Sequence, residues 1–172
     1  MGSWRGSSES LDEQRTPRRF EPLVGCFCCQ WCSYAAADMA GALRVSYPAN
    51  VRIVLVPCTG RIDVGHLLAA LEAGVDGVLV SGCLPGQCHY VDGNRKAAKR
   101  VERARAILKE IGVSPERIAM VHNAASMGPQ LARCFSEMTQ RIRTLGPIFP
   151  PRESTGVPGR RHRDRNGCSP VR

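Results

Sequence analysis

The middle of this 172-residue chain alternates between short apolar runs and amphipathic segments, a pattern that leaves few folds open. "VRIVLVP" (Val51–Pro57) and "DGVLVSG" (Asp76–Gly82) are apolar runs bounded by turn residues, which is typical of fully buried strands. A short run over Leu23–Phe27 and the segment "ERIAMVHNAAS" (Glu116–Ser126) predict two further strands. The runs are spaced so that one helix fits after each of them.

The segments between the runs carry apolar residues at steps of three and four, which predicts amphipathic helices. Asp63 is the expected N-cap of the second helix, and Gly74 stands where its C-terminal cap belongs. Asn94 is the expected N-cap of the third and longest helix, which ends before Gly112. The expected apolar stripes are Ala35, Met39 and Ala42 in a helix over Ser33–Leu43, Ala97, Val101, Ala104, Leu108 and Ile111 in the third helix, and Leu131, Cys134, Phe135, Met138 and Ile142 in a helix over Pro129–Leu145.

Strand and helix alternate four times, and this order predicts an α/β fold. We expect a small flavodoxin-like domain over residues 21–146, with a four-stranded parallel sheet and helices on both faces. Residues 1–20 are rich in Ser, Arg and Gly, and residues 147–172 combine Arg, Pro and Gly without periodicity. These compositions predict a flexible N-terminal tail and a disordered C-terminal tail.

Composition narrows the function classes. No apolar run approaches the ~20 residues that span a bilayer, and the N-terminus lacks the apolar stretch of a secretory signal. We therefore expect a cytoplasmic protein that does not contact a membrane. Of the formal net charge of +9, residues 147–172 contribute +4 and residues 1–20 contribute +1, so much of it comes from the tails. The core has no aromatic residues interleaved with basic ones, and nucleic acid is therefore not an expected partner. No set of residues typical of a catalytic pocket is visible, which predicts a non-catalytic subunit.

The nine cysteines are the residues that carry chemistry. An odd number in a chain without an export signal argues against a framework of structural disulfides. The stretch "GCFCCQWCSY" (Gly25–Tyr34) follows the first predicted strand, Cys58 follows the second, and Cys83 and Cys88 follow the third. Loops at the carboxyl ends of parallel strands meet at one edge of the sheet. Thiols that are distant in the sequence are therefore expected to converge there.

The cysteine spacings suit metal chelation. Cys29 and Cys32 are separated by two residues and Cys83 and Cys88 by four, and both steps occur among the ligands of ferredoxin-type clusters. Zinc is the rival metal, although its usual sites use two tight pairs and no third loop. A thioredoxin-like thiol–disulfide oxidoreductase that uses Cys29 and Cys32 is the alternative function, because this pair lies between a strand and a helix start. That alternative leaves the other loop cysteines without a role.

Three blocks of the sequence, "CQWCSYAAADMAG", "CTGRID" and "GCLPGQCHYVDGN", resemble the delta-type iron–sulfur subunit of methyl-viologen-reducing hydrogenase. The resemblance covers about residues 21–146. It implies a [2Fe–2S] cluster and an electron relay between a hydrogenase or formate dehydrogenase and the flavin subunit of a heterodisulfide-reductase-like complex. The family's cysteines correspond here to Cys29, Cys32, Cys58, Cys83 and Cys88, and which four of these five would be ligands is left open.

The remaining cysteines and the nearby aromatic residues receive other roles. We expect Cys26, Cys28 and Cys134 to be buried in the core, and Cys168 to be an incidental thiol in the C-terminal tail. His89 is expected to be a hydrogen-bonding or surface residue rather than a ligand. Trp31 and Tyr90 are expected either to shield the cluster from water or to pack at the rim of the sheet.

Overall fold

The computed structural model describes residues 20–149 of the chain. The predicted tails therefore lie outside the described residues, except for Phe20 and residues 147–149. Four strands, β1 (Val24–Cys29), β2 (Val51–Val56), β3 (Gly77–Gly82) and β4 (Ile118–His122), form one sheet in the order β2-β1-β3-β4. All neighbouring strands pair in parallel, which confirms the predicted four-stranded parallel sheet.

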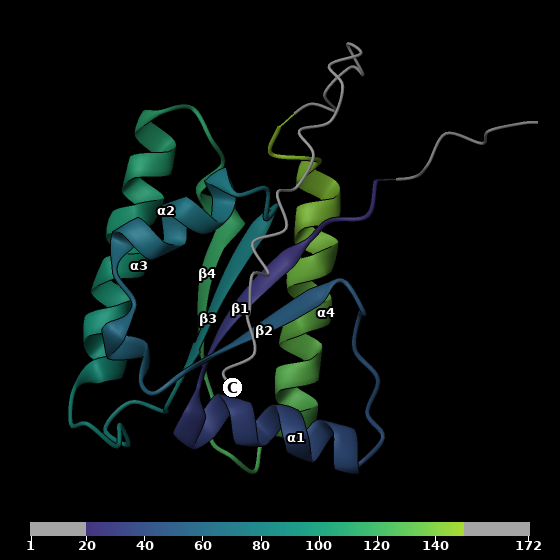
Figure 1. Cartoon of the computed structure of the whole chain (residues 1–172), viewed down its shortest axis with the longest axis vertical. Coiled ribbons are helices and arrows are strands. Elements are labelled where there is room, and N and C mark those ends of the chain that lie inside the picture. Colours follow the sequence, from purple (N-terminus) through teal and green to yellow (C-terminus); the bar gives the residue numbers. More distant parts are fainter. Residues whose placement is uncertain (1–19, 150–172) are drawn as a thin grey trace, which may run out of the picture.

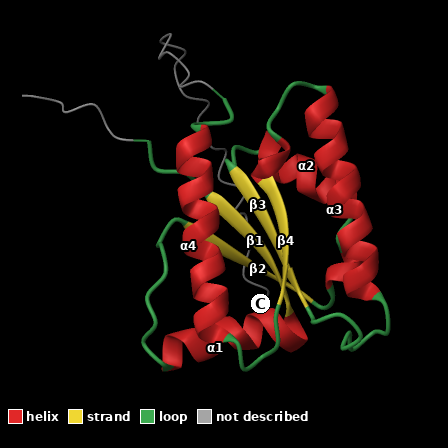
Figure 2. Cartoon of the chain, turned by 180° about the vertical axis from the view of Figure 1, so that it is seen from behind, coloured by secondary structure: helices red, strands yellow, loops and turns green. Residues whose placement is uncertain are grey.

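Helices cover both faces of this sheet, as predicted (Figure 1). Helices α1 (Ala35–Ala42) and α4 (Gly128–Leu145) lie on one side, and α2 (Val64–Glu72) and α3 (Gly93–Glu110) lie on the other, as the view from behind also shows (Figure 2). Short helical turns precede or connect these elements: η1 (Gln30–Tyr34), η2 (Thr59–Arg61) and η3 (Pro115–Arg117). None of the helices in the described part of the chain is long and apolar enough to cross a membrane.

Two hydrophobic cores lie between the sheet and its two helix layers. Successive residues of a strand point to opposite faces, so Cys26 and Cys28 face α1 and α4 while Phe27 packs toward α2 and α3. The first core also contains Leu79, Leu131, Phe135 and Ile142, and the second contains Leu67, Val80, Val101 and Leu108. The predicted burial of Cys26 and Cys28 is confirmed, and Cys134 is half-buried against the first core.

The prediction that Val51–Pro57 is a fully buried strand is wrong. Strand β2 lies at the edge of the sheet, where residues 20–149 provide no second neighbouring strand. Val54 is 43% exposed and Leu55 is 50% exposed, on opposite faces of the strand. The apolar run correctly predicts a strand. How deeply that strand is buried depends on the strand order, which cannot be predicted from the run.

Several expected boundaries also shift. Strand β1 extends to Cys29, so Cys26, Cys28 and Cys29 lie within the strand and not after it. The π-helical turn η1 then adds a residue to the first helical turn, and α1 buries Ala36, Ala37 and Ala40 in place of the predicted stripe Ala35, Met39 and Ala42. In α3 the N-cap is Asp92 and not Asn94, and Ile111 is exposed because the helix ends before it. The Asp63 cap of α2 is confirmed.

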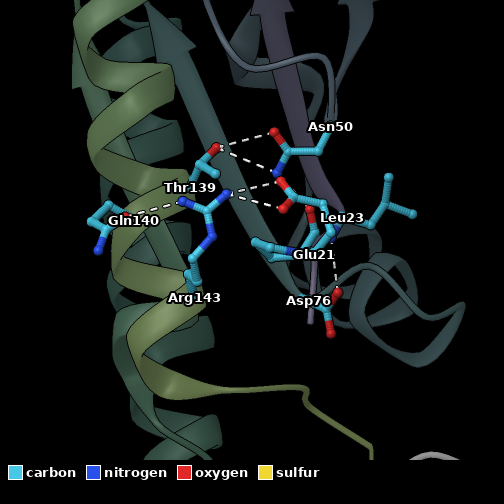
Figure 3. A network of polar contacts seen from close by, with 8 residues as sticks. Glu21, Leu23, Asn50, Asp76, Thr139, Gln140 and Arg143 are labelled. Atoms are coloured by element: carbon cyan, nitrogen blue, oxygen red, sulfur yellow. Dashed lines mark hydrogen bonds and ion pairs between the residues drawn. The ribbon is translucent and has the colours of Figure 1, made fainter. Parts of the chain in front are cut away.

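Polar contacts stabilise the segment that leads into β1 at the amino end of the sheet (Figure 3). The backbone N–H of Leu23 donates to Asp76 Oδ2 at 2.9 Å, and Arg143 on α4 pairs with Glu21 at 2.9 Å. These contacts hold the chain on the side opposite to the cysteine-bearing loops.

Candidate metal centre

The first two cysteines of the centre lie where β1 passes into η1. Cys29 is the last residue of β1, and Cys32 follows within the π-helical turn. Both residues are buried, with Cys29 1% and Cys32 5% exposed. The chelating step predicted from the sequence is therefore formed by the end of a strand and the turn that follows it.

The third cysteine comes from the neighbouring strand. Strands β1 and β3 pair in parallel, with Cys28 beside Ser81. Cys29 at the end of β1 and Cys83 just after β3 therefore lie next to each other where the two strands end. The Cys29 and Cys83 sulfurs lie 3.8 Å apart. The sulfurs of Cys29, Cys32 and Cys83 all lie within 4.8 Å of one another, which makes them a set that could hold a metal ion. We call this set the buried trio.

The other two cysteines form a neighbouring pair. Cys58 begins η2 after β2, and its sulfur lies 4.0 Å from that of Cys88. The backbone N–H of Gly60 donates to the Cys58 sulfur at 3.4 Å. Cys29 Sγ lies 4.0 Å from the carbonyl oxygen of Pro57, the residue before Cys58, so the pair adjoins the trio. The predicted convergence of all five loop cysteines at one edge is thus present in the structure.

The start of α3 shapes the space around the pair. Gly93 lies so close to the Cys58 sulfur that a Cβ at this position would overlap it. Asn94, which is 4% exposed, donates from Nδ2 to the carbonyl oxygens of Cys83 at 3.0 Å and Leu84 at 2.9 Å. The sequence predicts Asn94 only as a helix cap. Nothing in the sequence indicates that its side chain holds the Cys83 loop by hydrogen bonds. Both residues position the thiols without contributing a sulfur.

The thiols differ in their pKa values. A hydrogen bond from Cys32 is the main cause that lowers the pKa of Cys29 to about 5, and the same contact, together with burial, raises the pKa of Cys32. Burial raises the pKa of both Cys58 and Cys83. Burial also acts to raise the pKa of Cys88, but backbone N–H groups at the start of α3 outweigh it and lower this pKa. Cys29 and Cys88 are therefore the thiols most readily available as thiolates.

Aromatic side chains lie at the rim of the centre. The rings of Trp31 and His89 stack with centroids 3.9 Å apart, and Tyr90 packs edge-on against His89. Trp31 is 46% and Tyr90 51% exposed, so these side chains contact solvent, whereas the nearby cysteines are buried except for the half-buried Cys88. The stack joins η1 to the loop that carries Cys88, which matches the prediction of packing at the rim.

Only sulfur atoms make up the candidate ligand set in the described residues. Thiolates are soft ligands and suit iron–sulfur clusters or zinc rather than hard cations such as magnesium. Gly93 lies in close contact with Cys58, and Asn94 donates a hydrogen bond to the carbonyl oxygen of Cys83, so the surrounding residues fit closely around the thiols. Cys168 lies outside the described residues.

Comparisons with known proteins identify related sequences. The family model described as "Methyl-viologen-reducing hydrogenase, delta subunit" matches residues 24–146. The chain is 45% identical over 129 residues to an iron-sulfur subunit of the F420-non-reducing hydrogenase of Archaeoglobus profundus, a match that covers 75% of this chain and 94% of the relative. It is 42% identical over 128 residues to the vhu iron-sulfur subunit of the F420-non-reducing hydrogenase of Methanopyrus kandleri, covering 74% of this chain and 97% of the relative.

A third relative is much longer. The chain is 41% identical over 127 residues to one subunit of the ferredoxin:CoB-CoM heterodisulfide reductase of Methanosarcina mazei. This match covers 74% of the chain but only 16% of that relative. A domain of this kind therefore occurs both in short proteins of similar length and as one part of a larger polypeptide.

Proposed function

The chain belongs to the family of the methyl-viologen-reducing hydrogenase delta subunit, and from that premise we propose that it binds a [2Fe–2S] cluster and relays electrons between larger redox proteins. The observation that carries this proposal is the gathering of five cysteine sulfurs from three loops at one edge of the sheet. The short relatives are themselves named as iron-sulfur subunits. A cluster held by thiolates supplies one-electron exchange.

The proposed ligands are four of the five thiolates of Cys29, Cys32, Cys58, Cys83 and Cys88. The buried trio supplies three sulfurs that are already close together, and the adjoining pair supplies the fourth. The low pKa values of Cys29 and Cys88 favour metal binding, since ligand thiols must lose their protons. The fifth thiol would then lie next to the ligand set.

The surrounding residues would exclude water and fix the ligands. Cys29, Cys32, Cys58 and Cys83 are only 1–6% exposed, and the stacked rings of Trp31 and His89 would further limit the access of water. Asn94 holds the Cys83 loop against α3 through two hydrogen bonds. A shell of this kind would control the access of solvent to the site and thereby its reduction potential.

The proposed acceptor is a flavin protein of the heterodisulfide-reductase type. The relative from Methanosarcina mazei carries a similar domain within a much longer heterodisulfide reductase polypeptide, and two units joined in one polypeptide are good candidates for partners when they occur as separate chains. A hydrogenase or formate dehydrogenase is the proposed electron donor. The names of the short relatives, which are hydrogenase subunits, support the first of these two. The proposed role of the chain is thus non-catalytic electron transfer.

The proposed docking surface is the exposed apolar rim next to the thiols. It consists of Trp31, Tyr34, Tyr90 and Val91, which are 46%, 39%, 51% and 87% exposed. Val91 has a left-handed backbone (φ 72°), which is unfavourable for a β-branched residue and holds its side chain outward. Exposed aromatic side chains beside a buried redox group are suited to close contact with a second protein. Arg95 and Lys96, next along α3, are exposed and both pair with Asp92, which leaves one net positive charge beside the rim and favours a partner with an acidic surface around its contact.

The thioredoxin-like alternative rests on a specific observation. A pKa of about 5 at Cys29 would make this thiol a good nucleophile toward a disulfide, with Cys32 as its partner. Against this, the Cys83 sulfur lies 3.8 Å from Cys29, so the dithiol is not isolated. The two functions differ in one simple property, since only the cluster absorbs visible light.

The decisive experiment is the visible and EPR spectrum of the full chain after anaerobic purification, with iron and sulfide counted. We expect a coloured protein with about two irons and two sulfides per chain. Cys58→Ser is expected to bleach or destabilise the cluster, and the matched variant Cys134→Ser to leave its spectrum unchanged. A colourless protein that titrates as one reactive dithiol would support the alternative function, and bound zinc without iron would contradict the cluster.

A further inference from the structure

A buried polar network lies directly behind the thiols. It consists of Ser33 in η1, Ser81 on β3 and Asn123 just after β4, which are 0%, 0% and 3% exposed. The Ser33 hydroxyl lies 3.3 Å from the Cys32 sulfur. We propose that Ser33 is a positioning residue that raises the reduction potential of the centre by donating a hydrogen bond to the Cys32 sulfur. This inference rests on the proposed function and goes beyond it.

The Ser33 hydroxyl has one proton and several acceptors within reach. Its oxygen lies 2.6 Å from the carbonyl oxygen of Ser81 and 3.0 Å from Asn123 Oδ1, in addition to the Cys32 sulfur. The Ser81 hydroxyl donates to Asn123 Oδ1 at 2.5 Å, so this amide oxygen has a donor without Ser33. In this structure the Ser81 carbonyl oxygen is the nearest acceptor of the Ser33 proton, and the Cys32 sulfur is a second acceptor within reach.

Metal binding decides the direction of the contact with Cys32. In the free thiol either atom can donate, but a ligand sulfur has lost its proton. Only Ser33 can then be the donor. To donate to the Cys32 sulfur, the Ser33 hydroxyl must turn its proton away from the Ser81 carbonyl oxygen, and these two oxygens, 2.6 Å apart here, would then move apart.

Reduction would strengthen this hydrogen bond. An added electron increases the negative charge on the ligand sulfurs, and a hydrogen bond to a charged acceptor is roughly twice as strong as one between neutral groups. Because Ser33 is fully buried, water neither screens nor replaces the contact.

The test compares reduction potentials of full-length proteins that carry the cluster. In Ser33→Ala we expect a lower potential, so that at a fixed ambient potential the ratio of reduced to oxidised centre falls about tenfold, or ~59 mV for one electron. Ser81→Ala is the comparison variant, because it leaves the Ser33 hydroxyl in place but removes the other donor to Asn123 Oδ1, which then competes for the Ser33 proton; we expect a smaller fall in potential than in Ser33→Ala. Ser33→Thr keeps the hydroxyl and is expected to restore most of the potential.

A second readout follows the proton itself. Electron–nuclear double resonance of the reduced wild-type protein is expected to show an exchangeable proton coupled to the centre, which disappears in D2O and in Ser33→Ala. Equal shifts in Ser33→Ala and Ser81→Ala, or no shift in either, would overturn the role of Ser33 while leaving the cluster in place. A wild-type chain without iron and sulfide would instead overturn the proposed function, and this inference with it.

Discussion

Gly93 lies against the Cys58 sulfur at the start of α3, so closely that a Cβ on residue 93 would overlap this sulfur and lie 3.2 Å from that of Cys88. Gly93→Ala is therefore expected to push the two thiols out of place. Overpacking of this kind costs about 1–3 kcal/mol of stability. We expect a sharp loss of bound iron in a chain that still folds, measured by iron content and by circular dichroism.

Gly65→Ala is the control for this substitution. Gly65 lies in the first turn of α2, and a Cβ there would meet nothing within 4 Å. Alanine is the better helix former, so this variant is expected to keep its iron and its stability. Retention of full iron content by Gly93→Ala would show that the Cys58–Cys88 pair is not part of the metal site.

The pKa difference between two half-buried thiols predicts a pH-dependent labelling pattern in the metal-free protein. Backbone N–H groups lower the pKa of Cys88, whereas burial raises that of Cys134. Between the folded-state pKa of Cys88 and the value of about 8.5 for free cysteine, Cys88 is deprotonated while Cys134 is not. Iodoacetamide at pH 7 should therefore alkylate Cys88 faster than Cys134, and the Cys88 rate should fall as the pH drops through its folded-state pKa.

Peptide mapping by mass spectrometry measures both rates in one sample. Loading the protein with iron and sulfide is expected to protect Cys88 and to leave Cys134 unchanged if Cys88 is a ligand. Equal alkylation of the two cysteines at every pH would contradict the electrostatic role of the α3 start.

Arg117 supports the amino end of the fold and not the metal site. Its guanidinium is buried, and it donates to the carbonyl oxygens of Asp76 at 3.0 Å and Gly146 at 2.9 Å. Arg117→Met leaves these oxygens without a partner and is expected to lower the free energy of unfolding by about 3 kcal/mol, measured by urea denaturation. Arg141→Met, at an exposed position of α4, is expected to change it by no more than about 0.5 kcal/mol. Iron content should stay the same in both variants, and loss of iron from folded Arg117→Met would link the two ends of the sheet.

The exposed rim makes the docking proposal testable. Trp31→Ala and Tyr90→Ala are each expected to weaken binding to a cognate heterodisulfide-reductase flavin protein about tenfold, because large aromatic side chains dominate many protein interfaces. Titration followed by calorimetry measures this change. Leu43→Ala serves as control, since Leu43 is also 58% exposed but follows the end of α1 away from the thiols. Equal weakening by all three variants would argue against a specific role of the rim.

The sequence predicts the strands and helices well because each element leaves a local periodicity. The stripe of Ala97, Val101, Ala104 and Leu108 is buried in α3 as expected. The stripe predicted for α1 lies on the wrong face, because a π-helical turn before it changes the phase by one residue. The edge position of β2 is also missed, since an apolar run does not say how many neighbours a strand has.

The sequence by itself determined that the chain forms a parallel α/β sheet and that thiols follow three of its strands, because periodicity and loop position are local properties. Only the tertiary structure decided how those thiols group into a trio and a pair, that Gly93 and Asn94 shape the site, and that Ser33 lies behind Cys32. These relations join residues up to 54 positions apart, such as Cys29 and Cys83. Strand order and side-chain packing determine such distances, and neither can be predicted from any single stretch of the sequence.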